Sequence, residues 1–178
     1  MTRALPLALL VSMITTVTTS AQTTSRPAAD PEDVASVDAI IASLYDVISG
    51  PAGQERDWDR FRSLMHPNAK LIPVYRPQDA PQWQSTWLSA EDYIERAGPQ
   101  LTANGFFERE IGRVEERFGN IVHAFSTYDS RRTEDGEVFQ RGINSIQLMY
   151  DGGRWWVVNI MWQGVGPDVE IPARYLNR

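Results

Sequence analysis

Hydrophobic residues recur at helical spacing in the first half of the chain. Between residues 31 and 49 the apolar positions fall three or four apart, which is the spacing of one face of a helix. They are Val34, Val37, Ile41, Leu44 and Ile48. Residues 57–65 repeat the pattern over a shorter length, and Ser89 with Asp92 forms a capping box that begins a third helix. This half therefore predicts three helices, with Asp30–Pro31 as the N-cap of the first.

After Gly105 the spacing changes to alternation, which is the pattern of β-strands. Four long strands are predicted, over residues 106–118, 120–132, 138–150 and 154–163. A shorter strand at 70–75 contains Pro73, so we expect it at an edge of the sheet. Helices followed by a meander of strands predict an α+β domain. In it a curved antiparallel sheet would wrap the helices as a cone, whose mouth can hold a ligand.

The N-terminus has the pattern of a secretory signal peptide over residues 1–21. Arg3 precedes an apolar run, and small residues lead to Ala21, after which we expect cleavage. Threonines shorten the run below the roughly 20 residues of a membrane span. The product would be periplasmic or secreted and free of the membrane, with a retained N-terminal anchor as the alternative. Residues 22–33 are polar and contain two prolines, so we expect a flexible linker before one domain at 34–178.

Composition and charge exclude several classes of function. The chain of 178 residues has no cysteine and two histidines, so disulfides, iron–sulfur clusters and zinc sites are not expected. Its net charge of −6 disfavours nucleic acid as a partner. No phosphate-binding loop, nucleophile elbow or dinucleotide fingerprint is present, and we expect neither a cofactor nor a metal. Acidic and basic residues alternate between positions 108 and 117, which is typical of a solvated strand face.

Three short segments carry a resemblance to a known family. They are Leu64–Ala69, Arg141–Leu148 and Asp151–Gln163. They are similar to the turn before the first strand, the penultimate long strand and the closing strand of the NTF2-like superfamily, in particular its bacterial SnoaL-like branch. The resemblance covers roughly residues 34–163. It implies the cone-shaped fold but no single activity, because that fold hosts isomerases, dehydratases, cyclases, oxygenase subunits and proteins without chemistry.

The resemblance to the steroid isomerases of this superfamily is incomplete where their chemistry lies. Those enzymes place a carboxylate base after the first strand, where this chain has Pro73. They also carry an acid on the penultimate strand, and the corresponding residue here is Asn144. Unlike a carboxyl group, an amide can donate a hydrogen bond to a ligand without a change in its pKa. A structural role, joining neighbouring strands, is the alternative for Asn144.

His123 is the candidate general base. Side chains alternate along a strand, so His123 and Phe125 share a face. If that face lines the cone, His123 provides an imidazole that ordinarily titrates near neutral pH; a structural histidine is the alternative. Tyr45 on the first helix and Tyr75 on the short strand can also reach the cavity. The expected ligand-binding residues are therefore Asn144, Tyr45, Tyr75, Phe125 and Trp162.

The last strand is apolar on both faces. Strict alternation gives one face with Trp156, Val158, Ile160 and Trp162, and another with Trp155, Val157, Asn159 and Met161. We expect the helices to cover one face and a second subunit to cover the other, which predicts a homodimer through the sheet face. A monomer with exposed tryptophans is the alternative.

Three functions remain open. The first is an exported domain that binds a small, largely apolar molecule in its cone without catalysing a reaction. The second is a cofactor-free isomerase, dehydratase or cyclase that uses His123 as general base and Asn144 as donor. The third is a dimeric structural accessory module. The position of His123 relative to the cavity distinguishes the second function from the other two.

Overall fold

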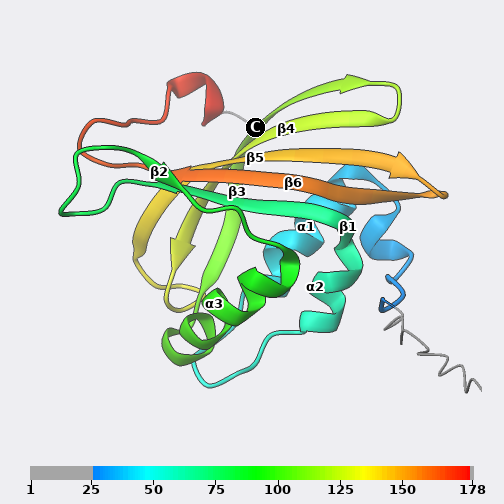
Figure 1. The fold of residues 1–178 in the computed structure, drawn as a ribbon, viewed down its shortest axis with the longest axis horizontal. Coiled ribbons are helices and arrows are strands. Elements are labelled where there is room, and N and C mark those ends of the chain that lie inside the picture. Colours follow the sequence, from blue (N-terminus) through cyan, green and yellow to red (C-terminus); the bar gives the residue numbers. More distant parts are fainter. Residues whose placement is uncertain (1–25, 177–178) are drawn as a thin grey trace, which may run out of the picture.

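The computed structural model describes residues 26–176, which form a curved sheet with helices packed against one side (Figure 1). The helical elements are η1 (Glu32–Val34), α1 (Val37–Ile48), α2 (Trp58–Leu64), α3 (Ala90–Asn104) and η2 (Ala173–Tyr175). The strands are β1 (Met65–Tyr75), β2 (Gln84–Ser85), β3 (Phe107–Phe118), β4 (Ile121–Arg131), β5 (Val138–Asp151) and β6 (Arg154–Gly164). The predicted α+β class, with three helices before four long strands, is confirmed.

The N-terminal predictions fall partly outside these residues. The signal peptide, residues 1–21, lies outside the described part of the chain. Within the predicted linker at 22–33, Arg26 Nε donates to a backbone carbonyl of α2 at 2.7 Å and Asp33 forms an ion pair with Arg60 at 2.7 Å, so residues 26–33 contact the domain. Between residues 26 and 176 no helix is long and apolar enough to cross a membrane.

The first helix begins later than its sequence pattern suggests. Its N-cap is Ser36, whose Oγ accepts a hydrogen bond from the Ala39 amide at 3.0 Å. Asp30 instead accepts from the Glu32 amide at the start of η1, so the predicted cap begins a separate short turn. Ser36 has an extended backbone, which ends η1 and starts α1. The capping box predicted for the third helix is confirmed at the start of α3.

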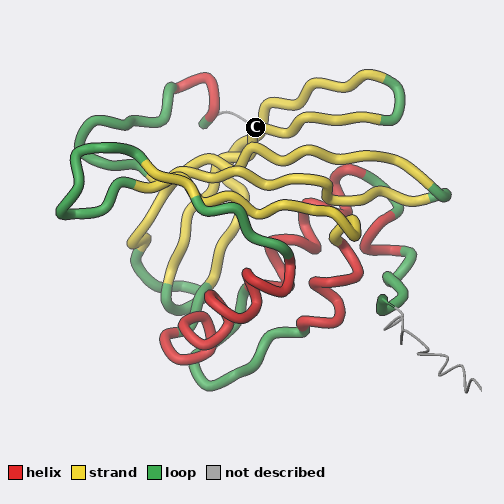
Figure 2. Tube along the Cα trace, viewed as in Figure 1, coloured by secondary structure: helices red, strands yellow, loops and turns green. Residues whose placement is uncertain are grey.

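The sheet has six strands in the order β2-β1-β6-β5-β4-β3. Strands β3 to β6 form the predicted antiparallel meander. However, β1 pairs with β6 in parallel, so the sheet is mixed and the prediction of a wholly antiparallel sheet is wrong. The two-residue β2 pairs with the end of β1, which places Pro73 one strand in from the edge. The three α-helices lie on one side of the sheet and η2 lies on the other (Figure 2).

A β-bulge in β6 changes which tryptophans face the helices. The β5–β6 pairing skips one residue, Val158, so strict alternation fails at that point. Trp155, Val157 and Ile160 are buried against the helices, and Trp162 packs against the same core. The sequence predicted that Trp156 shares a face with Trp162 and that Trp155 shares a face with Met161, and both predictions are wrong. The opposite, convex face carries Trp156, Asn159 and Met161.

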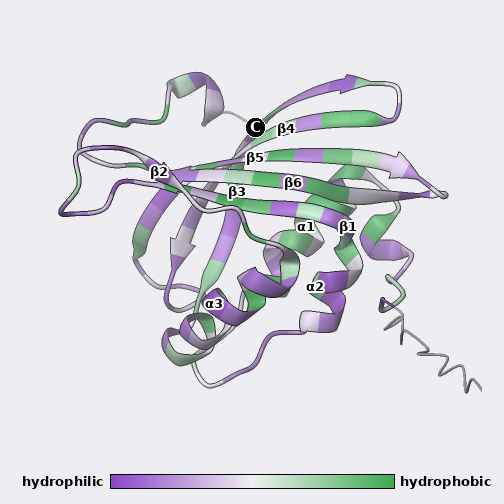
Figure 3. Cartoon of the chain, viewed as in Figure 1, coloured by the Kyte–Doolittle hydropathy of each residue, from purple (hydrophilic) through white to green (hydrophobic). Residues whose placement is uncertain are grey.

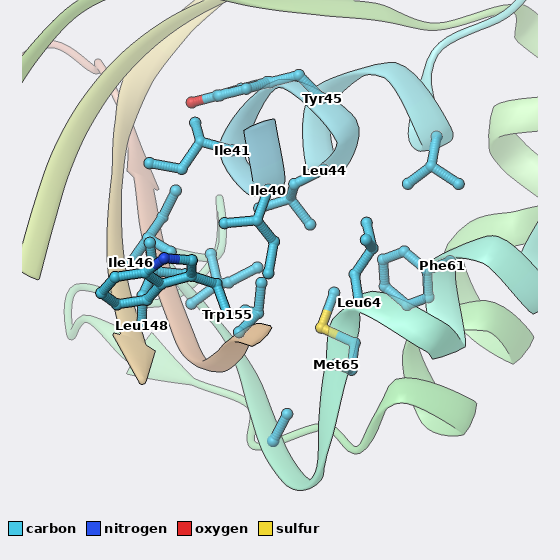
Figure 4. Close-up of a cluster of buried hydrophobic side chains, with 14 of the residues drawn as sticks. Ile40, Ile41, Leu44, Tyr45, Phe61, Leu64, Met65, Ile146, Leu148 and Trp155 are labelled. Atoms are coloured by element: carbon cyan, nitrogen blue, oxygen red, sulfur yellow. The ribbon is translucent and has the colours of Figure 1, made fainter. Parts of the chain in front are cut away.

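The core lies between the helices and the concave face of the sheet. Ile40 and Ile41 of α1 are almost fully buried, as are Phe61 of α2 and Ile146 of β5. Figure 4 shows the α1 side chains between the sheet residues and those of α2. Hydropathy alternates along the strands in Figure 3, as expected for a sheet covered mainly on one face. Each buried aliphatic or aromatic side chain contributes about 1.5–3 kcal/mol.

A buried arginine holds the end of α1 next to α3. Arg56 is 5% exposed and donates to the carbonyl oxygens of Ile48 at 3.0 Å, Gly50 at 2.6 Å and Leu101 at 3.1 Å. These carbonyls lie at or near the C-terminal ends of the two helices, where backbone acceptors have no partner within the helix. Arg56 thereby positions the chain from which the cavity described below is built.

Candidate functional site

A cavity of about 230 Å³ lies between the concave face of the sheet, α1 and α3. Its wall consists of seven aromatic, four aliphatic and four polar residues. The aromatic and aliphatic residues are Tyr45, Phe61, Tyr93, Phe106, Tyr128, Phe139, Trp162, Leu44, Ile48, Leu71 and Ile160. The polar residues are Glu108, Ser130, Gln140 and Asn144. Glu108 is thus the one charged residue of the wall.

The end of α1 and strand β4 position Glu108. Its backbone amide donates to Ser49 Oγ at 3.0 Å, and Ser49 is the C-cap of α1. Ser130, its partner in the β3–β4 register, donates from Oγ to Glu108 Oε2 at 2.9 Å. Asn144 on β5 donates from Nδ2 to Glu108 Oε1 at 3.3 Å. Each carboxyl oxygen therefore accepts one hydrogen bond from the cavity wall.

The environment of Glu108 favours its neutral form. Burial raises the pKa of Glu108 from an ordinary value of 4.5 to about 7. The hydrogen bonds from Ser130 and Asn144 oppose this change, and the negative charge of Asp129 adds to it. The Glu108 carboxyl consequently exchanges a proton near neutral pH, which is the range in which a side chain can act as a general acid or base.

A chain of hydrogen bonds leads from the cavity to an ion pair. Asn144 Nδ2 also donates to the Tyr45 hydroxyl at 3.1 Å, and that hydroxyl lies 2.6 Å from Ser126 Oγ. Because Ser126 Oγ donates to Glu110 Oε1 at 2.5 Å, it accepts the proton of Tyr45. Glu110 in turn pairs with Arg113 at 2.8 Å. Burial and the charge of Glu108 raise the pKa of Tyr45, so its phenol stays protonated.

Two further phenols face the cavity without a partner. Neither the Tyr93 nor the Tyr128 hydroxyl forms a hydrogen bond with any residue from 26 to 176, although Tyr128 is only 4% exposed. Burial and the charge of Glu108 raise the pKa of both tyrosines. A Cβ at Gly142 would lie 2.4 Å from the Tyr128 hydroxyl, so glycine is needed there. Both hydroxyls are therefore available to a ligand or to water in the cavity.

Three of the residues predicted for the site lie in the cavity wall. Asn144, Tyr45 and Trp162 are brought together there, and Asn144 and Trp162 are directly paired in the β5–β6 register. Tyr75 does not line this cavity; it is 42% exposed and its hydroxyl lies 3.4 Å from Thr86 Oγ1 on the loop that follows β2.

His123 and Phe125 lie on the opposite, convex face. A general base would have to line the cavity, and His123 does not. His123 Nε2 lies 3.0 Å from Ser145 Oγ, and its ring packs against Phe125. Phe125 contacts Tyr175 of η2 with 5.0 Å between ring centroids and lines a groove of about 240 Å³ beside the C-terminal segment. Their neighbour Ala124 is fully buried on the concave side, and alternation therefore directs His123 outward.

Sequence reasoning missed Glu108, which it assigned to a solvated face of β3. The alternation of charges along β3 is broken by a bulge at Ile111, because Glu110 pairs with Tyr128 and Gly112 pairs with Thr127. Before the bulge the glutamates at 108 and 110 point towards α1. Phe106 shares the face of Glu108, but the adjacent Phe107 lies on the other face, so the aromatic residues at the start of β3 did not show which face is inside.

Comparison with known proteins relates the chain to solved structures alone. No family model matches it, and no curated protein matches it. An NTF2-like protein of unknown function from Silicibacter pomeroyi is 13% identical, with a TM-score of 0.50 over 72% of this chain and 92% of that one. A protein of unknown function with a cystatin-like fold from Nostoc punctiforme is 9% identical, with a TM-score of 0.57 over 75% and 90% of the two chains.

A third similar structure, from Exiguobacterium sibiricum, is assigned as a calcium/calmodulin-dependent kinase II association domain. It is 10% identical, with a TM-score of 0.54 over 74% of this chain and 92% of that one. At such low identity these likenesses show a shared fold and carry no activity with them.

Proposed function

We propose that this chain, which has the NTF2-like fold, binds a small, largely apolar molecule in the cavity of its cone. The composition of the cavity wall carries the proposal, since apolar and aromatic side chains surround a few convergent polar groups. The volume of about 230 Å³ exceeds the roughly 150 Å³ of a void that holds benzene. A molecule with one ring and a polar substituent fits this space, with the substituent directed towards Glu108 and Asn144.

A cavity-filling variant tests this proposal. Benzyl alcohol, a neutral one-ring probe, is expected to raise the melting temperature of the wild-type chain by binding the native state. Leu71→Trp places an indole in the cavity and is expected to abolish that rise. Leu176→Trp makes the same change at an exposed position and should retain it. A rise that survives in Leu71→Trp would contradict binding in the cone.

A spectroscopic measurement keeps the test independent of whether Leu71→Trp folds. The indole N–H resonance of Trp162, in the cavity wall, should shift when benzyl alcohol is added to the wild-type chain. The resonance of Trp87, which is 64% exposed and outside the wall, should stay in place. Equal shifts, or no shift of either resonance at millimolar probe, would count against the proposal.

Cofactor-free proton transfer is a second candidate, favoured by the pKa of about 7 for Glu108. In this function Glu108, and not His123, would remove a proton from a carbon next to a carbonyl group and return it to another carbon of the same molecule. The unpaired Tyr93 and Tyr128 hydroxyls would donate to the carbonyl oxygen as it gains charge. The rate of deuterium exchange into a bound ketone should then fall by about a hundredfold or more in Glu108→Gln.

Export and dimerisation complete the proposal. Mass spectrometry of the mature protein tests cleavage after Ala21.

A homodimer through the convex face is supported by the apolar side chain of Met161, 38% exposed there, and by the association domain among the similar structures. Light scattering at micromolar concentration should give twice the monomer mass, and a monomer would rule out this assembly.

A further inference from the structure

We propose that the molecule bound in this cavity carries a positively charged nitrogen on an apolar ring or chain, and that Glu108 is its counterion. This inference rests on the proposed function, because it specifies the chemistry of the ligand of the same cavity. The ligand class is therefore a small organic amine or quaternary ammonium ion.

The charge of Glu108 has no cationic partner in the described chain. Its hydrogen-bond donors are the neutral Ser130 and Asn144. The nearby arginines are engaged elsewhere: Arg109 and Arg131 pair with Asp129 at 3.0 and 3.2 Å on the other face of the sheet, and Arg113 pairs with Glu110. Glu108 is half-buried, and a carboxylate that is partly removed from water without a counterion is unfavourable. A cationic ligand removes this penalty, whereas an anionic ligand increases it.

The remainder of the wall also suits a cation. Aromatic ring faces carry partial negative charge and attract ammonium groups when water is excluded. Seven aromatic residues line the cavity, and Tyr93 and Trp162 meet edge to face with 6.2 Å between ring centroids. One ring, Phe139, already has the Arg132 guanidinium 4.1 Å from its centroid, so the other six are the rings available to a cationic ligand. The unpaired hydroxyl oxygens of Tyr93 and Tyr128 can accept hydrogen bonds from an amine. Glu108 and the rings thus favour the same charge on the ligand.

Glu108 is the group of this site that titrates near neutral pH. Burial and the charge of Glu108 raise the pKa of Tyr45 on α1 and of Tyr93 on α3, as they do for Tyr128 on β4. Burial opposes the ionisation of Asp129 on β4, but hydrogen bonds from two arginines lower its pKa, so it stays charged. Asn144 on β5 does not titrate. The affinity for a cation should therefore follow the ionisation of Glu108.

Three probes of nearly equal size separate charge from shape. Benzylamine, benzyl alcohol and benzoate carry positive, zero and negative charge on the same ring, and calorimetry at pH 7.5 gives their dissociation constants for the full chain. We expect benzylamine to bind about tenfold or more tightly than benzyl alcohol, and benzoate to bind more weakly than both. Glu108→Gln should abolish the preference for the amine while benzyl alcohol still binds.

A matched variant controls for the loss of one negative charge. Glu116→Gln makes the same change on the same strand at an exposed position outside the cavity, and it should keep the wild-type preference. A preference that persists in Glu108→Gln would overturn the inference, since the cation would then bind elsewhere.

The dependence on pH requires no variant to fold. Phenyltrimethylammonium has a charge that does not titrate, so its affinity for the wild-type chain reports the ionisation of the protein. Between pH 6 and pH 8 the ionised fraction of a carboxyl with a pKa of about 7 rises from about one-tenth to nine-tenths, and the affinity should rise about tenfold. A flat profile would overturn the inference.

The outcomes separate this inference from the proposed function. If benzyl alcohol binds in the cavity and benzylamine binds no better, the ligand is neutral: the inference fails and the proposed function stands. If no probe of any charge shifts the Trp162 resonance, both fail together.

Discussion

Replacing Glu108 with glutamine should stabilise the protein, and the gain should grow as the pH rises. Burial raises the pKa of Glu108 to about 7 in the folded protein, whereas the ordinary value of 4.5 applies when the chain is unfolded. The folded state therefore binds more protons between these values, and its stability falls as the pH rises through this range. Glutamine has almost the same shape as the protonated carboxyl and does not ionise, so Glu108→Gln removes this loss.

The magnitude follows from the two pKa values. At 1.36 kcal/mol for each pKa unit, the difference between about 7 and 4.5 corresponds to about 3 kcal/mol once both states are ionised. At pH 8.5 the wild-type chain carries this full penalty. At pH 5.5 only about 1 kcal/mol has developed, because the folded state is still protonated. The advantage of Glu108→Gln should thus increase by about 2 kcal/mol from pH 5.5 to pH 8.5.

Urea unfolding followed by tryptophan fluorescence at the two pH values measures this change. All titrating groups other than Glu108 are common to both proteins, so their contributions cancel when the two free energies of unfolding are subtracted. Glu116→Gln, exposed on the same strand, should change the free energy of unfolding by less than about 0.5 kcal/mol at either pH. A Glu108→Gln effect that is equal at pH 5.5 and 8.5 would show that the carboxyl has an ordinary pKa in the folded protein, and would refute the reasoning.

Further substitutions test the core, the helix ends and the site. Phe61→Ala should lower the free energy of unfolding by about 3–5 kcal/mol in urea, because a fully buried ring leaves a void. Arg56→Met should cost about 3 kcal/mol or more in the same assay, since three buried carbonyls each lose one donor. Gly142→Ala should raise the dissociation constant of benzyl alcohol, because the new Cβ would lie 2.4 Å from both the Tyr128 hydroxyl and the backbone oxygen of Gln163 and would distort this wall of the cavity. His123→Ala should leave that constant within about twofold, and a tenfold loss would contradict its place on the convex face.

Local patterns along the chain were sufficient to predict the three α-helices and the strands β3 to β6. The capping box at Ser89 and the change to alternation after Gly105 depend on residues within one or two turns of each other, and both appear in the fold. The same reasoning misplaced the start of α1, because it assigned the cap to Asp30–Pro31 where Ser36 had the extended backbone that a cap requires. Element type is a short-range property, whereas a boundary depends on which of several local caps the packing selects.

Contacts between distant segments decided the faces of the strands, and with them the site. Bulges at Ile111 and Val158 reverse the alternation that sequence alone implies, and they arise from strand register. Asn144 lies in the cavity as predicted, while His123 points outward and Glu108 points inward. A one-residue shift moves a side chain to the other face of the sheet at no local cost. The sequence by itself thus determined the α-helices, the four long strands after Gly105 and the turns between them, and only tertiary packing decided which titratable group the cavity encloses.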